Sequence, residues 1–160
     1  MIGRPFDFRR YASAVRGRLR APSEPDVKID PDYTKRLLQA FQDAPRPYLM
    51  PSELLSLDPP MPNNDELLLH VRALADSGAI ENNVKGQPIG IEGRALDGSG
   101  GRLVEHALRM TSRGDEVLAA LRSPTFGARV RDRFLSEGAN LAIAYARRLV
   151  WEQFGMTVDE

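Results

Sequence analysis

The residues best suited to metal chemistry are two histidines and a carboxylate near one of them. Glu66 precedes His70 by one helical turn, a spacing that brings both side chains to the same helix face. His70 and His106 are the only histidines, and the chain has no cysteine. A zinc site needs more nitrogen or sulfur ligands than this set offers, so we expect no metal. A polar helix flank is enough to explain His70.

Motifs for covalent or phosphate chemistry are missing as well. The sequence has no Gly-x-Ser-x-Gly elbow, and no Lys-Ser/Thr pair follows the glycines at 98, 100 and 101. The tripeptide Arg113-Gly114-Asp115 matches an adhesion motif, but it falls in the first turn of a predicted helix and is accidental. We therefore expect a protein that is not an enzyme and that uses no cofactor.

Positive charge gathers at the N-terminus. Residues 1–20 hold six Arg against one Asp, whereas residues 21–110 hold nine basic and fourteen acidic residues. In the whole chain, 22 Lys and Arg balance 22 Asp and Glu. Phe8, Tyr11, Val15 and Leu19 recur at helical spacing within the basic segment. We predict an amphipathic basic arm, helical alone or on a partner, on a mildly acidic body.

The body that positions these residues is predicted to mix helices and strands. Asp30 and Pro31 predict the start of one helix, and residues 51–57 form a second. Asn63 is the expected cap of a third helix that ends at Gly78. The expected strands are residues 79–82 and 102–110, with a further strand possible within residues 89–96. Later helices are expected to begin at Thr111 or Ser112, at Ser123-Pro124 and near residue 139, with the last ending near residue 154.

Two local strings resemble winged helix-turn-helix signatures. The string from His70 to Ile80 is similar to the end of a recognition helix that runs into the first wing strand. Arg109-Met110-Thr111-Ser112-Arg113-Gly114 is similar to the strand-to-helix junction that follows the wing. Residues 30–154 also resemble a small family of phage and bacterial proteins with a Gly break and an apolar final helix. The resemblance to that family implies a fold but does not imply a function.

The fold class expected is therefore α+β. We predict a winged helix-turn-helix with additional C-terminal helices and a basic N-terminal arm. The expected division is an arm and linker at 1–28, a winged-helix domain at 29–122, and a helical extension at 123–155 packed on it. No apolar run reaches the roughly 20 residues of a membrane span, and no signal core is visible, so a cytoplasmic protein is expected.

The third helix gives conflicting signals about its target. Leu67, Leu68, Val71, Leu74 and Ala75 fall within one arc, which predicts its buried face. The opposite face then shows three acids, Arg72, Leu69 and Ala73, and its net charge is unfavourable for DNA phosphates. Asn63 and Asn64 have the right chemistry to reach base edges, although helix capping accounts for both. The acids around the apolar pair suit a protein contact instead.

Two functions remain open. The first is a DNA-associated regulator that contacts phosphate through its arm and wing. The second is a protein-partner module, such as a phage or defence-related adaptor or inhibitor, that uses the third helix. Self-association through the final helix is a further possibility. The candidate binding residues for DNA or a partner are Arg9, Arg10, Arg16, Arg18, Asn63, Asn64, Leu69, Arg72, Lys85, Arg94 and Arg102.

Overall fold

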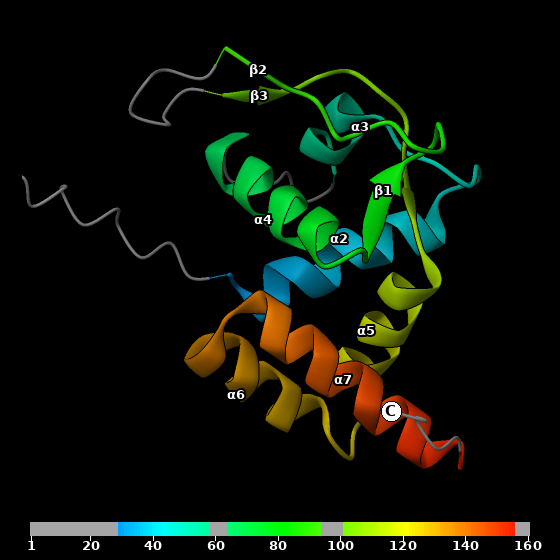
Figure 1. Ribbon diagram of the computed structural model, residues 1–160, viewed down its shortest axis with the longest axis vertical. Coiled ribbons are helices and arrows are strands. Elements are labelled where there is room, and N and C mark those ends of the chain that lie inside the picture. Colours follow the sequence, from blue (N-terminus) through cyan, green and yellow to red (C-terminus); the bar gives the residue numbers. More distant parts are fainter. Residues whose placement is uncertain (1–28, 58–63, 94–100, 156–160) are drawn as a thin grey trace, which may run out of the picture.

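The computed structural model describes residues 29–57, 64–93 and 101–155, which form a mixed α and β body (Figure 1). The arm and the predicted helix cap Asn63 lie outside these residues. In chain order the elements are α2 (Pro31–Asp43), α3 (Pro51–Leu55), α4 (Asn64–Asp76), β1 (Ile80–Asn82), β2 (Ile91–Glu92), β3 (Arg102–Leu103), β4 (Leu108–Met110), α5 (Ser112–Arg122), α6 (Gly127–Glu137) and α7 (Ala139–Gln153).

Helix α2 begins where its capping residues predict. The Asp30 carboxylate accepts hydrogen bonds from the backbone N–H groups of Asp32 and Tyr33, at 2.8 and 3.3 Å. These bonds satisfy donors that have no partner within the first helical turn. Tyr33, Leu37, Leu38 and Phe41 recur every three or four residues and form its buried face.

Two short antiparallel pairs form the β structure. Strand β1 pairs with β4, with Asn82 opposite Leu108, and β2 pairs with β3 beyond them. Leu49, between α2 and α3, adds an isolated bridge to β4, because it exchanges two backbone hydrogen bonds of 2.8 Å with Leu108. The chain therefore runs helix, bridge, helix, helix, strand, ribbon, strand, helix. The strand predicted within residues 89–96 is present as β2.

The junction between β4 and α5 is closely packed. Thr111 caps α5, and its hydroxyl oxygen accepts the N–H of Gly114 at 3.4 Å. The same hydroxyl donates to the carbonyl of Gly78, so it ties the end of α4 to the start of α5. Gly114 is buried, and a Cβ atom there would lie 2.4 Å from the carbonyl oxygen of Ala79. The predicted start of this helix at Thr111 or Ser112 is confirmed.

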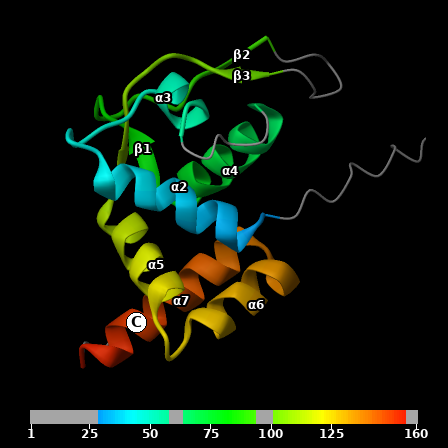
Figure 2. The same cartoon turned by 180° about the vertical axis from the view of Figure 1, so that it is seen from behind.

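Helices α6 and α7 form a hairpin beside α5 (Figures 1 and 2). The expected start at Ser123-Pro124 is wrong, because α6 begins at Gly127 after a turn in which the Ser123 hydroxyl accepts backbone N–H groups. Gly138, at φ 84°, separates the two helices as predicted. Helix α7 packs on α4, α5 and α6, while Leu141 on its other side stays exposed. Self-association through α7 stays a prediction.

One apolar cluster joins all of these helices. Side chains from both halves of the chain contribute to it, and its largest fully buried members come from α2, α3, α4, β1, β4, α5 and α6. They are Phe134, Leu37, Leu38, Leu54, Leu67, Leu74, Ile80, Leu108 and Leu118. The final hairpin is thus packed into the same core as α2 and α4.

Candidate binding surface

Helix α4, the predicted contact helix, is buried around most of its circumference. Among its described side chains only Asp65, Arg72 and Asp76 are exposed, and they form one narrow stripe with a net charge of −1. Leu69 and Ala73 are partly buried and pack against the core. The prediction that Leu69 points outward is therefore wrong. A helix that reads the major groove presents several side chains to the bases, and this stripe offers few.

The position of His70 on this helix also differs from the prediction. Its side chain is buried, with 1% of its surface exposed, so it does not lie on a polar flank. The backbone N–H of Asp30 donates to Nε2 at 2.9 Å, which leaves the ring hydrogen on Nδ1. Nδ1 donates to the carbonyl oxygen of Glu66 at 2.8 Å. The neutral ring therefore links the beginning of α2 to the first turns of α4.

The surroundings of His70 favour its neutral form. The ring stacks on Tyr33, with centroids 4.1 Å apart. Burial lowers the pKa of His70 below its ordinary value, while the Glu66 carbonyl and the charges of Glu66 and Asp30 oppose this shift. Burial, with help from Glu66, raises the pKa of Tyr33 to about 12. Both rings thus stay uncharged at neutral pH.

Basic side chains of the body are mostly matched by acids. The described residues contain fourteen Lys and Arg against fifteen Asp and Glu. Arg102 pairs with Glu92 at 3.2 Å, and similar pairs join Arg109 to Glu81, Arg131 to Asp32 and Arg133 to Glu137. The structure therefore gives no continuous strip of free arginines on α6. Such exposed pairs contribute little stability, but they lower the net positive field.

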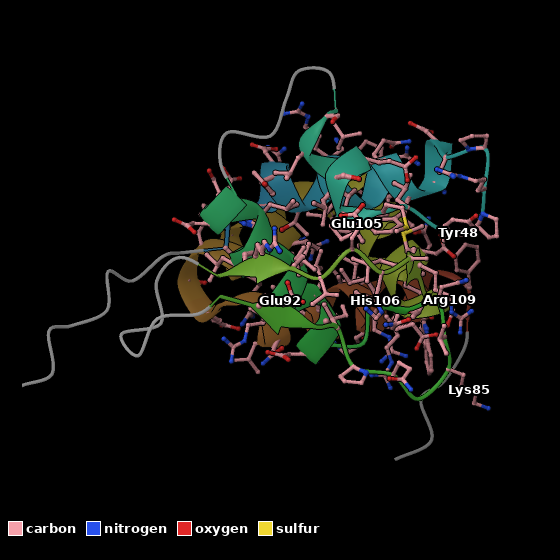
Figure 3. The ribbon with its side chains drawn as sticks, turned by 90° about the horizontal axis from the view of Figure 1, so that it is seen from above. Tyr48, Lys85, Glu92, Glu105, His106 and Arg109 are labelled. Carbon is pink, nitrogen blue, oxygen red and sulfur yellow. The ribbon has the colours of Figure 1, made fainter. Side chains whose placement is uncertain are left out.

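Lys85 and Arg102, the two cations of the predicted wing that the structure describes, lie apart from each other. Lys85 is exposed, and no ion pair to it is found within the described part of the chain. Figure 3 shows Lys85 at one edge of the molecule, whereas Glu92, the partner of Arg102, lies toward the other end of the ribbon. Lys85 and Arg102 therefore do not belong to one surface. Arg9, Arg10, Arg16, Arg18, Asn63 and Arg94 lie outside the described residues, as does the side chain of Asn64.

Several elements begin or end on the same side of the body. The first residues of α2, the first residues of α4 and the outer ends of β2 and β3 face the same direction in Figures 1 and 2. The arm joins the body at Ile29, directly before α2, so its attachment point lies on this side. We call it the tip side. Lys85 is not part of it.

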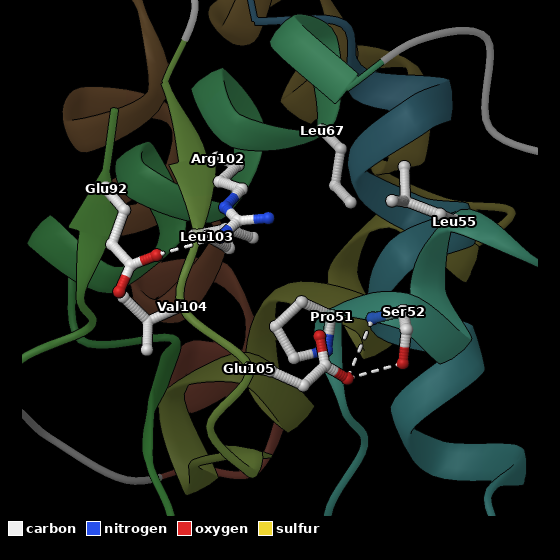
Figure 4. A pocket seen from close by; sticks show the side chains of 9 residues that line it. All are labelled: Pro51, Ser52, Leu55, Leu67, Glu92, Arg102, Leu103, Val104 and Glu105. Carbon is white, nitrogen blue, oxygen red and sulfur yellow. Dashed lines mark hydrogen bonds and ion pairs between the residues drawn. The ribbon is translucent and has the colours of Figure 1, made fainter. Parts of the chain in front are cut away.

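A cleft of about 530 Å³ opens between α3 and the β2–β3 ribbon (Figure 4). Glu105 fixes one wall, because its carboxylate accepts the backbone N–H of Ser52 at 3.3 Å and also the Ser52 hydroxyl. The Arg102 side chain extends from β3 toward the opening. The cleft is lined by apolar and charged side chains of α3, α4 and the ribbon: Pro51, Ser52, Leu55, Leu67, Glu92, Arg102, Leu103, Val104 and Glu105.

No family model, curated protein or solved structure matches this chain. Its own geometry therefore carries the functional argument.

Within residues 29–57, 64–93 and 101–155, no group of three or more His, Asp and Glu side chains is placed to hold a metal ion. None of the described helices combines the length and apolarity that crossing a membrane requires.

Sequence reasoning missed the structural roles of His70 and Glu105. A signal for His70 was present, because it stands three residues after Leu67 and four before Leu74, on the arc that proved to be buried. Glu105 contacts a residue 53 positions away, and nothing local in the sequence predicts that contact.

Proposed function

We propose that this chain is a non-catalytic winged-helix binding protein, a DNA-associated regulator that contacts phosphate through its basic arm and its wing. The order of elements supports the winged-helix assignment. In this assignment Leu49 supplies the first strand, α3 and α4 the helix-turn-helix, and the β2–β3 ribbon the wing. A fold of this kind does not itself define a target, so the proposal depends on the tip side.

The proposal rests on one observation: α2, α4 and the β2–β3 ribbon each have an end on the tip side. Residues 1–20 carry a net charge of +5, and the described chain begins at Ile29, on the side where α4 begins and the ribbon ends. Arg102, which is 74% exposed, pairs with an exposed Glu92, and such a pair exchanges readily for a phosphate. Helix α4 contributes little in this arrangement, because its exposed stripe is narrow and acidic. Contacts of this kind give binding with weak sequence preference.

Binding should weaken steeply with salt, and the arm should account for most of that dependence. Replacing Arg9, Arg10, Arg16 and Arg18 by Gln is expected to reduce the slope of log K against log salt by about 3 to 4, since each phosphate contact contributes about 0.9. Fluorescence anisotropy with a labelled duplex, titrated at several salt concentrations, measures the slope.

Lys85→Gln is the matched control for this experiment. It removes one exposed cation that lies away from the tip side, so affinity and slope should stay unchanged. Binding that ignores salt, or that survives loss of the arm charges, would exclude the proposal. An equal loss in Lys85→Gln would show that phosphate contacts are not confined to the tip side.

A protein-partner role is the second candidate, and the cleft beside α3 favours it. Leu55, Leu67 and Val104 give the cleft an apolar lining, and carboxylates of Glu92 and Glu105 stand at its walls. This combination suits a partner segment with an apolar anchor and basic neighbours. Leu69, the residue first expected in such a contact, is partly buried and unsuited to it.

Leu55→Arg should reduce partner binding at least about tenfold, because Leu55 lines the cleft on the α3 side and a long charged side chain there would occupy it. Val84→Arg is the control, since Val84 is 60% exposed and lies outside the cleft. A partner captured by crosslinking would be identified by mass spectrometry, and its affinity for each variant measured by calorimetry. Equal affinities for wild type and Leu55→Arg would rule the cleft out.

A further inference from the structure

We propose that His70 is a proton-sensitive latch that holds the attachment point of the arm against α4. The latch consists of two hydrogen bonds made by one buried ring. Nε2 accepts the N–H of Asp30, next to the residue where the arm joins the body, and Nδ1–H donates to Glu66 within α4. This inference does not depend on what the arm binds.

Protonation of the ring is incompatible with the first of these bonds. A proton on Nε2 removes the lone pair that accepts the Asp30 N–H and places two donors face to face. Of the two carboxylates that act on the ring, that of Asp30 is engaged in capping α2 through the N–H groups of Asp32 and Tyr33. Adding a proton therefore disturbs the start of α2 whether the ring turns away or recruits the carboxylate.

The charged groups around the ring come from both helices that it joins. Glu66 of α4 and Asp30 of α2 are the negative charges that act on His70. Arg36, also on α2, acts on the neighbouring Tyr33, and Arg131 of α6 pairs with Asp32 in the first turn of α2. The two nearby carboxylates reduce the free-energy cost of protonating the ring, whereas burial increases that cost.

The sign of the pH effect follows from burial. The folded chain favours the neutral ring, so the unfolded chain binds the proton more tightly. The contribution of His70 to the free energy of unfolding is complete above the ordinary histidine pKa of about 6.5. It is lost as the pH falls from there toward the lower pKa of the folded chain. The latch is therefore closed at neutral pH and opens in acid.

An NMR titration of the full chain from pH 7.5 to 4.5 tests this inference. At neutral pH, nitrogen shifts should show a hydrogen on Nδ1 and none on Nε2 of His70. As the ring is protonated, the hydrogen-exchange protection factor of the Asp30 amide should fall by at least about tenfold. The protection factor of the Leu74 amide, further along α4, should fall much less. Exposed His106 provides the comparison ring in the same spectra.

His70→Gln separates the latch from general acid instability. The Gln side-chain oxygen can accept the Asp30 N–H but cannot titrate in this range, so the pH dependence of Asp30 protection should disappear. Persistence of that dependence in His70→Gln would overturn the latch. So would a wild-type ring that titrates while Asp30 protection stays constant, a result that needs no variant.

Discussion

Replacing Gly114 by Ala should destabilise the protein by about 3 kcal/mol. In an open helix position the same change is neutral or stabilises by up to about 1 kcal/mol, because glycine is a poor helix former. At position 114 the new Cβ would lie 2.4 Å from the Ala79 carbonyl oxygen and 2.4 Å from the Met110 side chain. The Ala79 oxygen is backbone, and it accepts the N–H of Thr111 at 3.0 Å, so relief requires α5 to move away from β1 and β4.

Urea unfolding followed by far-UV circular dichroism measures this loss. We expect the same m-value for the variant and the wild type, which would show that the two differ only in stability. Ser112→Ala is the control, since Ser112 is exposed in the same helical turn and its replacement should change stability by less than about 0.5 kcal/mol. If Gly114→Ala were as stable as wild type, the close contact between α5 and Ala79 would be incorrect. The winged-helix assignment would then lose its strand-to-helix junction.

The parts of this fold that follow local rules were predictable from the sequence. Asp30 before Pro31, Thr111 three residues before Gly114, and Gly138 between two apolar stripes each determine a helix end by chemistry within a few residues. The positions of the strands also followed from apolar runs that flank a Gly-rich segment, but the single strand expected at residues 102–110 is divided into β3 and β4. Propensity and capping act locally, so a single sequence contains the signal for them.

The candidate surface was harder to predict because it depends on contacts between distant residues. Leu69 and Ala73 carried no local sign of burial, and it is their packing against the core that covers them. Arg131 and Arg133 are two closely spaced basic residues, but Arg131 pairs with Asp32, which lies 99 positions away in the sequence. Charge read along the sequence therefore overestimates the charge a partner meets, since ion pairs form across the fold.

Replacing Phe134 by Ala is expected to have the other large effect, a loss of about 3 to 5 kcal/mol. Phe134 is 1% exposed and is among the largest fully buried side chains of the core. Its removal leaves a cavity among helices that come from both halves of the chain. Leu135→Ala is the matched control, because Leu135 follows it in α6 and is 53% exposed, so the loss there should stay below about 1 kcal/mol.

The same variant tests whether α6 and α7 unfold with the rest of the body. Trp151 is the only tryptophan, and its ring N–H donates to Glu116 of α5 at 3.1 Å, so its fluorescence reports the contact between α5 and α7. A shared core predicts that fluorescence and circular dichroism melt together in wild type and shift together in Phe134→Ala. An earlier fluorescence transition would make the hairpin a separate unit. Coincident transitions would mean that a chain ending at residue 122 lacks part of its own core, and that binding tests require the full chain.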